Sequence, residues 1–596
     1  LGEGSDWALE EVRIADRLWA TNEIADQIDP DGDGMVTPWE EHNGLDSNEN
    51  DGDGNLDGDG FTNFEEYQMN TCPTNPGDPV LQEYFVNDDS TAGDVYCSHT
   101  GISTNDGKSA STPLRSVSEV IAKYDLRGKD IVYVDTGNYT DSIVLTSSDS
   151  GSSTNGYLTI QGSTNRPAGG SVFTLNGGNG LDISGVSYLK VRNLGFRQAR
   201  NGVFLRSGNA IRLEGIACWS NSYAGFDVDT TYGLTMEGCV AAWNTSFGLI
   251  AWQHAPAWRN GVLWENGAGL YAYTNHPVTI SNSVIRQASG KAFINVPGSA
   301  VGDYNVFDIG PGASFAGTSL PKLTDFQKEY NREWHSISAP ADLSVTNWCD
   351  FHPRSVSRRY GAGGTWETDT VHSACIDLGD PALAVGEEPA PNGGRRNVGA
   401  YGGTAEASQS RTGPWLLALT YNEGGVLSGA SNALYWTCGG FTDETVNVEY
   451  STNLGLTWNF VADVAATNGF YVWDVSTNGP MACYWRVVCA ADTNMWDRND
   501  RQVAVSGGTV AYYVNDDSTD GDVYCAGIGS RVPGAGLSSN VPLRELSEVI
   551  ERYSPGAGAV IYVDTGGYTN PVVLRGNGSG SSTNGYLTIQ GSTNRP

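Results

Sequence analysis

The sequence has few positive charges and no long apolar run. Only 34 Lys and Arg stand against 69 Asp and Glu, which gives a formal net charge of −35. A field of that sign repels nucleic acid and anionic lipid and attracts cations. No apolar segment approaches the roughly 20 residues that a membrane-spanning helix requires. We therefore expect no nucleic-acid partner and no membrane span in this segment.

Two further shortages concern cysteine spacing and overall charge. The ten cysteines include no Cys-x-x-Cys pair, which argues against a zinc ribbon and is typical of an oxidising compartment. Charged residues make up only 17% of the chain, whereas glycine occurs 76 times, a mixture that favours turn-rich β structure. We expect a mainly β protein at an extracellular or cell-surface location.

A chain of 596 residues exceeds what one hydrophobic core usually serves, so several domains are expected. Four are predicted: a helical calcium-binding module at 1–80, a parallel β-helix at 81–410, a β-sandwich at 411–508, and the start of a second β-helix at 509–596. In the first of these, apolar residues recur at helical spacing over residues 7–24, which predicts an amphipathic helix.

Directly after this helix comes an acidic loop, DPDGDGMVTPWE, from Asp29 to Glu40. It matches the calcium-loop pattern D-x-D-x-D-G-x₅-E at every fixed position, with Gly34 at the sharp turn. The alternative is a solvated acidic linker. The pattern predicts a Ca²⁺ site whose ligands are the carboxylates of Asp29, Asp31 and Asp33, the Met35 backbone carbonyl, Thr37 through water, and bidentate Glu40.

A second loop, NLDGDGFTNFEE, extends from Asn55 to Glu66. It begins with Asn rather than Asp, which implies weaker binding, and Asp51 and Asp53 just upstream could shift its register. The pair of loops resembles those of dockerins and of the thrombospondin type-3-like linkers of bacterial surface proteins. The predicted Ca²⁺ ligands of the second loop are Asn55, Asp57, Asp59, the Phe61 carbonyl, Asn63 and Glu66.

Five segments of the central region repeat with a nearly constant period. Each has Asn or Gly in one column, and the members follow at spacings of 22, 23, 22 and 22 residues. Apolar and polar residues alternate before that column, as in half-buried strands. One turn of a parallel β-helix fits this period, with stacked Asn side chains bonding between coils at the bends. The column consists of Asn193, Gly215, Gly238, Asn260 and Asn282.

The same region resembles the right-handed β-helix family whose members include pectate lyases. The opening block NDDSTAGDVYC…STPLRSVSEVI…DIVYVDTGNY and the closing block DYNVF…ACIDLGDP…EPAPNGGRRNVGAYGGTAEAS resemble the ends of bacterial secreted β-helix proteins. The resemblance implies a scaffold, on which LRSVSEVIAKY is a helix that caps the open end. It does not imply an activity, because unrelated functions share this fold.

Catalytic candidates on the β-helix are weak. We find no family catalytic motif, and His254 is a lone histidine that we interpret as a surface or packing residue. The charged strand positions are interpreted as solvated, so we expect no enzyme activity. The outward-facing candidates are Lys190, Arg192, Arg212, Glu214, Asp227, Asp229, Glu237 and Arg259.

Aromatic residues leave two alternatives open, a strip that holds sugar rings or rings that fill corners of the coil. We favour packing. The residues concerned are Trp219, Trp243, Trp252, Trp258, Trp264, Tyr271 and Tyr273.

Segment 413–508 contains short alternating strands with turn signals between them, as in a sandwich. The stretches Val446–Trp458 and Cys483–Val487 resemble the immunoglobulin-like domain of bacterial surface proteins.

The cysteines are interpreted as structural. Cys438 is expected to bridge to Cys483 or Cys489, and Cys349 to Cys375. Cys218 and Cys239 are expected to remain two buried thiols, because their Cα atoms would lie about 8 Å apart, beyond the roughly 7 Å limit of a disulfide.

The chain contains an internal repeat. The stretch Tyr84–Cys97 returns at Tyr512–Cys525, and Gly151–Pro167 returns unchanged at Gly580–Pro596. We expect a second β-helix and a tandem array, or an assembly in which a neighbouring chain covers the open coil.

The function predicted is a structural or adhesive segment of a long surface protein, such as a filament, whose partners are neighbouring copies or repeats of itself. The alternative is a carbohydrate-active enzyme or a sugar-binding module on the β-helix flank.

Overall fold

A computed structural model describes residues 29–594 apart from short gaps. The helix predicted over residues 7–24 lies outside the described residues. Within the described part, no helix is both long and apolar enough to cross a membrane. The gaps are 59–60, 70, 76–81, 154–155, 166–169, 254–255, 274–277, 295–299, 316–319, 321, 346–349, 362–363, 442–443, 479–480, 507–510, 533, 554, 556–558, 573 and 575–585.

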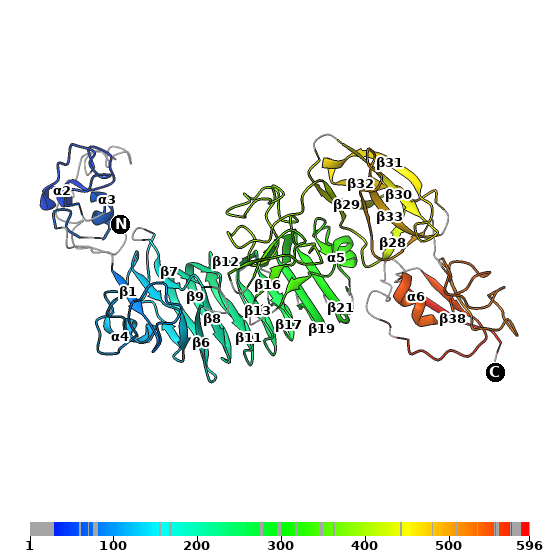
Figure 1. Cartoon of the computed structure of the whole chain (residues 1–596), viewed down its shortest axis with the longest axis horizontal. Coiled ribbons are helices and arrows are strands. Elements are labelled where there is room, and N and C mark those ends of the chain that lie inside the picture. The colour runs from blue at the N-terminus through cyan, green and yellow to red at the C-terminus, as the bar shows by residue number, and fades with distance from the viewer. Residues whose placement is uncertain are drawn as a thin grey trace, which may run out of the picture.

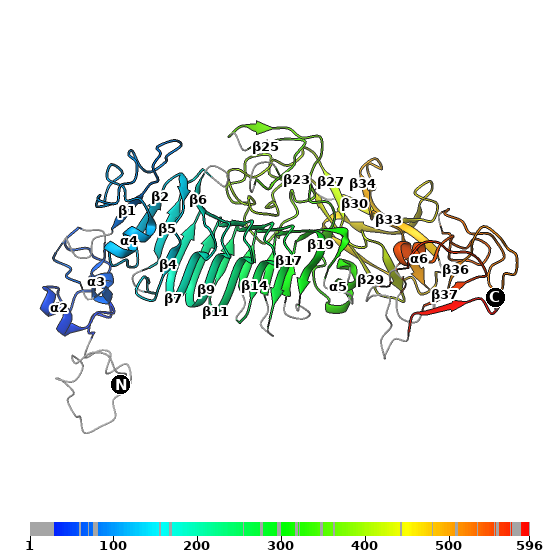
Figure 2. The ribbon, with the colours of Figure 1, turned by 90° about the horizontal axis from the view of Figure 1, so that it is seen from below.

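The centre of the molecule is a parallel β-helix of 22 strands, coiled along the long axis in Figure 1. Figure 2 shows its coils from a second side. The strands are β1 (Glu83–Val86), β2 (Ile131–Val134), β3 (Gly137–Tyr139), β4 (Ile143–Leu145), β5 (Leu158–Gly162), β6 (Ser171–Thr174), β7 (Asn179–Arg192), β8 (Leu194–Arg197), β9 (Asn201–Glu214), β10 (Ala217–Trp219), β11 (Ala224–Tyr232), β12 (Thr235–Glu237), β13 (Val240–Ala242), β14 (Phe247–Ala251), β15 (Ala257–Arg259), β16 (Val262–Trp264), β17 (Ala268–Ala272), β18 (Val278–Ser281), β19 (Val284–Ile294), β20 (Ala300–Asp303), β21 (Val306–Ser314) and β22 (Ile337–Ser338).

The register between coils confirms the predicted period. Residues in one column pair directly from coil to coil in parallel register, and each step along the chain is 22 or 23 residues. Apolar side chains that point inward form one continuous core along the coils. The column is Gly195, Ala217, Val240, Val262, Val284 and Val306.

The predicted Asn and Gly column is a corner of the coil. All five members have positive φ, between 46° at Asn260 and 63° at Gly215 and Gly238. This left-handed backbone is the conformation that Gly and Asn adopt with least strain. The prediction that Asn residues bond to one another is wrong for this column, since Asn260 Nδ2 instead donates to the Asn397 carbonyl at 3.0 Å.

A ladder of amide side chains lies instead at a different, buried corner. Asn221 Nδ2 donates to Asn244 Oδ1 at 2.9 Å, and Asn244 Nδ2 donates to Asn266 Oδ1 at 2.9 Å. Each of these Asn side chains is at most 5% exposed. An amide suits such a stack because it both donates and accepts.

Both ends of the β-helix are covered. Helix α4 (Val117–Lys123) begins after Ser116, whose hydroxyl accepts from Glu119 N, and it buries Val117 and Val120 in the core. At the other end, α5 (Leu323–Tyr330) brings Phe326 to a ring cluster with Phe293 and Phe315.

The closing block folds back over one flank of the coils. Outward side chains of the column, such as Val240 and Val262, form a second core with Phe351, Val398 and Tyr401. The corner itself is held too, because Asn282 Oδ1 accepts from Asp380 N at 2.8 Å. The short strands of the closing block are β23 (Leu343–Ser344), β24 (His352–Pro353), β25 (Arg359–Tyr360) and β26 (Trp366–Glu367).

Two largely antiparallel sheets follow, around a core that contains Trp436 and Trp485. One sheet contains β27 (Trp415–Ala418), β29 (Asn432–Gly439) and β32 (Phe470–Trp473). The other contains β28 (Gly425–Ser428), β35 (Val503–Ser506), β33 (Met481–Cys489), β30 (Thr445–Ser451) and β31 (Asn459–Ala465), with β34 (Trp496–Arg498) beside β33.

The predicted disulfide of Cys438 is wrong, because Cys438, Cys483 and Cys489 are all thiols. Cys438 Sγ lies 3.5 Å from the Ala466 carbonyl and donates to it. Cys375 is also a thiol, while its predicted partner Cys349 lies outside the described residues. Cys218 and Cys239 are buried thiols, as expected.

The last segment repeats the first coil. Strands β36 (Ala511–Val514), β37 (Val560–Val563) and β38 (Thr588–Gly591) pair in parallel, beside α6 (Leu546–Tyr553). Buried Asp564 accepts from the backbone amides of 523–525, as Asp135 does from those of 95–97. The repeated sequence therefore builds the same local structure twice.

Candidate metal centre

The acidic loop at Asp29 leads into helix α2 (Thr37–Asn43), which has Pro38 in its first turn. Asp29 holds the loop closed, because Oδ1 accepts from Gly32 N at 2.9 Å and Oδ2 accepts from Gly34 N at 3.1 Å. Gly34 has φ +93°, a conformation that a side chain rarely permits. The turn that the pattern requires at this position is therefore formed.

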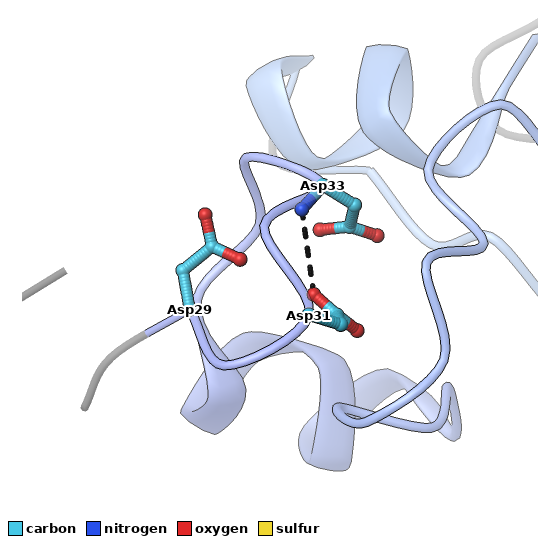
Figure 3. A group of neighbouring side chains, drawn as sticks. All are labelled: Asp29, Asp31 and Asp33. Carbon is cyan, nitrogen blue, oxygen red and sulfur yellow. Dashed lines mark hydrogen bonds between the residues drawn. The ribbon is translucent and has the colours of Figure 1, made fainter. Parts of the chain in front are cut away.

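Three predicted ligands converge in this loop. One carboxylate oxygen from each of Asp29, Asp31 and Asp33 lies within 4.8 Å of the others. Figure 3 shows the three side chains on one short stretch, with Asp33 N donating to Asp31 Oδ1 at 3.4 Å. Like charges at such separations repel, and a cation bound between them removes the repulsion.

Glu40, in the first turn of α2, is the most informative residue of the group. Its side chain is 0% exposed, and neither carboxylate oxygen has a hydrogen-bond partner. Burial, together with the charges of Asp31, Asp33 and Asp51, raises the pKa of this carboxyl to about 7. A buried carboxylate without a partner is costly, and a bound cation would supply the missing interaction.

The other two predicted positions of the first loop also turn inward. Met35 is 0% exposed, so its thioether lies in the interior while its backbone belongs to the loop. Thr37 Oγ1 is buried and has no hydrogen-bond partner. The donor set is made of hard oxygens throughout, which suits Ca²⁺ and not a thiolate-seeking metal.

Sequence reasoning did not assign Asp51 to the first site. In the structure, Asp33, Glu40 and Asp51 each place a carboxylate oxygen within 4.8 Å of the other two. Asp51 stands at the start of a run of alternating Asp and Gly, but nothing in the spacing shows that this run reaches back to Glu40. The contact arises because the segment just before the second loop packs against the first loop.

The second loop leads into helix α3 (Asn63–Met69). Asn55 Oδ1 accepts from Gly58 N at 2.6 Å, and Asn63 Oδ1 accepts from Leu56 N at 3.2 Å. Asn63 and Glu66 are buried, at 2% and 0% exposed. Asp57 belongs to the same loop, and Asp59 lies outside the described residues. The second Ca²⁺ site stays a prediction.

Phe61, predicted to offer its carbonyl, lies where the second loop meets the β-helix. Its ring is buried, with the Lys129 ammonium 4.0 Å from the ring centre. Lys129 Nζ also pairs with Glu65 Oε1 at 2.8 Å. Burial raises the pKa of Glu65, but the hydrogen bonds from Lys129 and Thr62 outweigh it and leave the pKa below its ordinary value.

Six of the eight catalytic candidates on the β-helix flank contact neighbouring coils or the closing block. Arg192 pairs with Glu214 at 2.8 Å. His254 lies outside the described residues. The remaining contacts are Arg206 with Asp227 at 3.1 Å, Arg396 with Glu237 at 3.2 Å, and Lys190 and Arg212 over the ring of Tyr157.

The aromatic candidates separate into two groups. Trp219 and Trp258 are fully buried, and Trp243 and Trp264 pack against Phe351 of the closing block. The packing interpretation is confirmed for Trp219, Trp258 and Trp264, whereas Trp243 contacts Phe351 and stays 37% exposed. Trp252, Tyr271 and Tyr273 form a separate cluster, with ring centres 5.2 to 6.3 Å apart.

Comparison with known families supports the scaffold. A family model described as the right-handed beta helix region matches residues 136–306, which lie within the coils between β2 and β21. Comparisons with curated proteins and with solved structures gave no match. The chain therefore contains a right-handed parallel β-helix, a scaffold that enzymes and non-enzymes share.

Proposed function

We propose that this chain is a calcium-stiffened structural segment of an extracellular or cell-surface protein, in which successive β domains form one rod. The observation that carries the proposal is that the β-helix, the sandwich and the second opening block meet through packed contacts. In Figures 1 and 2 they follow one another along the long axis of the molecule. Neighbouring repeats or copies of the chain are the partners that such a rod implies.

Glu423 makes the first junction, between the sandwich and the end of the β-helix. Its carboxylate accepts from Leu323 N at 2.9 Å and from the Ser338 hydroxyl. Beside it, the ring of Tyr435 stacks on that of Trp334 with centres 5.5 Å apart. Hydrogen bonds to a charged group contribute more than neutral ones, so this junction resists bending.

The second junction connects the sandwich to the following opening block. Ala482 and Ala504 of the sandwich belong to the same buried core as Tyr512 and Tyr553. A shared core forces the two parts to move together, because separating them would expose apolar surface. The resemblance of this sandwich to immunoglobulin-like domains of surface proteins agrees with a spacer role.

The amino-terminal module completes the rod by way of its calcium loops. Five carboxylates gather around the first loop, and the module contacts the β-helix through Lys129 and Glu65. Ca²⁺ is abundant outside cells, where weakly binding loops of this kind are filled. The metal would hold the loops in one conformation and so fix the orientation of the module.

Small-angle X-ray scattering of Glu423→Ala tests the rod. We expect the scattering of the unmodified chain in Ca²⁺ to fit one elongated particle. The scattering of the variant should fit only an ensemble with a range of domain orientations. Asp463→Ala, an exposed position on β31, is the matched control and should scatter like the unmodified chain. If the unmodified chain itself needs a range of orientations, the proposal is wrong.

A second candidate function, sugar binding on the β-helix flank, is favoured by the cluster of Trp252, Tyr271 and Tyr273. Tyr273 is 58% exposed, and Trp252 is oriented by a hydrogen bond from Nε1 to Asp227 Oδ1 at 2.8 Å. Exposed rings of this kind stack on sugar faces. Affinity electrophoresis with polysaccharides tests it, with retardation lost in Tyr273→Ala and kept in Tyr232→Ala, another exposed tyrosine.

A further inference from the structure

We propose that Asp51 is a calcium ligand of the first site, supplied from outside the twelve-residue loop, and that it couples the filling of the two loops. This inference rests on the calcium site of the proposed function and adds to it a residue and a regulatory consequence. Asp51 lies eleven residues beyond Glu40, the last position of the loop pattern.

The geometry places Asp51 in the coordination sphere of the loop. Carboxylate oxygens of Asp33, Glu40 and Asp51 all lie within 4.8 Å of one another. Calcium binds oxygen at 2.3–2.6 Å, so two ligand atoms on opposite sides of one ion lie about 5 Å apart or less. Asp33 and Glu40 are the fifth and twelfth positions of the pattern, so Asp51 joins an existing ligand set.

Unsatisfied oxygens point to a ligand in this space. Glu40 is fully buried with both carboxylate oxygens unpartnered, and Asp51 Oδ1 and Asp33 Oδ2 are buried without a hydrogen-bond partner. Four buried acceptors with no donor is a rare arrangement, because buried polar atoms are almost always paired. A divalent cation meets all of them at once.

The backbone of Asp51, four residues before the second loop, is hydrogen-bonded to that loop. Its carbonyl accepts from Gly54 N at 2.7 Å and from Asn63 Nδ2 at 2.9 Å. Asn63 is a predicted ligand of the second site. The side chain of Asp51 thus faces the first site, while its main chain holds a ligand residue of the second.

Close packing makes this connection stiff. A Cβ atom added at Gly52 would lie 3.2 Å from the Asp33 carbonyl oxygen, and one added at Gly34 would lie 2.6 Å from the ring of Phe64. The loops have no space to slide past each other. Calcium in the first loop would fix Asp51 and thereby pre-order Asn63, which lowers the entropic cost of filling the second loop.

Calorimetric titration of the full chain with Ca²⁺ tests the inference, using Asp51→Asn and the matched control Asp53→Asn. Asp53 is exposed, and its substitution removes the same charge from the same run. We expect Asp51→Asn to weaken the tighter site on the order of tenfold or more, because site affinity follows the count of charged ligands. Asp53→Asn should change it less than about twofold.

The outcomes separate this inference from the proposed function. If the unmodified chain binds no Ca²⁺, or if Glu40→Gln binds as well as the unmodified chain, the proposed calcium site itself is wrong. If Glu40→Gln abolishes tight binding while Asp51→Asn matches Asp53→Asn, the site stands and the role of Asp51 is wrong. If Asp51→Asn lowers the Ca²⁺ affinity of both binding steps by the same factor and leaves the circular dichroism spectrum unchanged, the coupling between the two loops is supported.

Discussion

Lys129 of the β-helix forms an ion pair with Glu65 of the amino-terminal module, with Nζ 2.8 Å from Oε1. Lys129 stands just before β2, at a positive φ of 71°, and its ammonium also lies over the ring of Phe61. One cation therefore contacts two residues of the segment that forms the second loop. This pair therefore connects the segment of the second loop to the β-helix.

Replacing Lys129 with Met should loosen the module without unfolding it. Both partners of the pair are about one third exposed, so we expect a loss of stability of at most about 1 kcal/mol. Hydrogen exchange at 61–69 should become faster, while exchange in β2 stays unchanged. Lys123→Met, at an exposed position on α4, serves as the control. Equal exchange in the two variants would show that the pair does not hold the module.

Removing Ca²⁺ should affect the module and leave the β-helix intact. The carboxylates of Asp29, Asp31, Asp33 and Glu40 repel one another without a cation. We expect chelation to expose residues 20–75 to limited proteolysis while a fragment that contains the coils survives. Equal protease resistance with and without chelator would argue against a structural role for calcium.

Glu333, at the end of the β-helix, predicts a pH dependence of stability. It is 2% exposed and accepts from Asn305 Nδ2 at 2.9 Å, and burial, followed by the charge of Asp303, raises its pKa to about 8. A raised carboxyl pKa means that the folded state binds the proton more tightly. The contribution of protonated Glu333 to the free energy of unfolding is therefore complete at pH values below the ordinary pKa of 4.5. It is lost as the pH rises through about 8.

Glu333→Gln tests this dependence, because the amide resembles the protonated acid. In urea unfolding of the β-helix, the variant should match the unmodified chain within about 1 kcal/mol at pH 5. At pH 9 it should be more stable, by a difference on the order of 1–4 kcal/mol. Glu329→Gln, an exposed position on α5, should show no such gain. If the stability of the unmodified chain, Glu333→Gln and Glu329→Gln changes with pH in the same way, Glu333 is not the group responsible.

Asn244, in the middle of the buried amide ladder, should be sensitive to substitution. Its side chain accepts from Asn221 N and Nδ2 and donates to Asn266 Oδ1 and the Cys218 carbonyl. Asn244→Ala leaves several buried groups unpaired, and we expect a loss of about 2–4 kcal/mol in thermal or urea unfolding. Asn209→Ala, at an exposed position on β9, should cost less than about 0.5 kcal/mol.

We also predict that the chain does not cleave polysaccharides. Several charged residues on the flank form ion pairs with neighbours, as in Arg192 with Glu214 and Arg396 with Glu237. Pectin, alginate and host glycans should release neither unsaturated nor reducing sugar on incubation with the protein. Release that disappears in Lys190→Ala or Glu237→Ala would overturn the prediction.

The coil period and the first loop could be predicted from the sequence by itself. A left-handed corner admits Gly and Asn with least strain, so the column from Asn193 to Asn282 is visible as a repeat. The predicted ligands of the first loop lie within twelve consecutive residues, so their spacing alone brings Asp29, Asp31 and Asp33 together. Local chain geometry determines both features.

Only the tertiary structure decided which distant residues meet. Asp51 reaches Glu40 because the segment before the second loop packs against the first loop. Trp219 is buried within the core that the closing block shares with the coils. Cys438 stays a thiol although it shares a core with Cys483 and Cys489. These outcomes depend on how separate elements pack, and side-chain packing between elements leaves no periodic trace in the sequence.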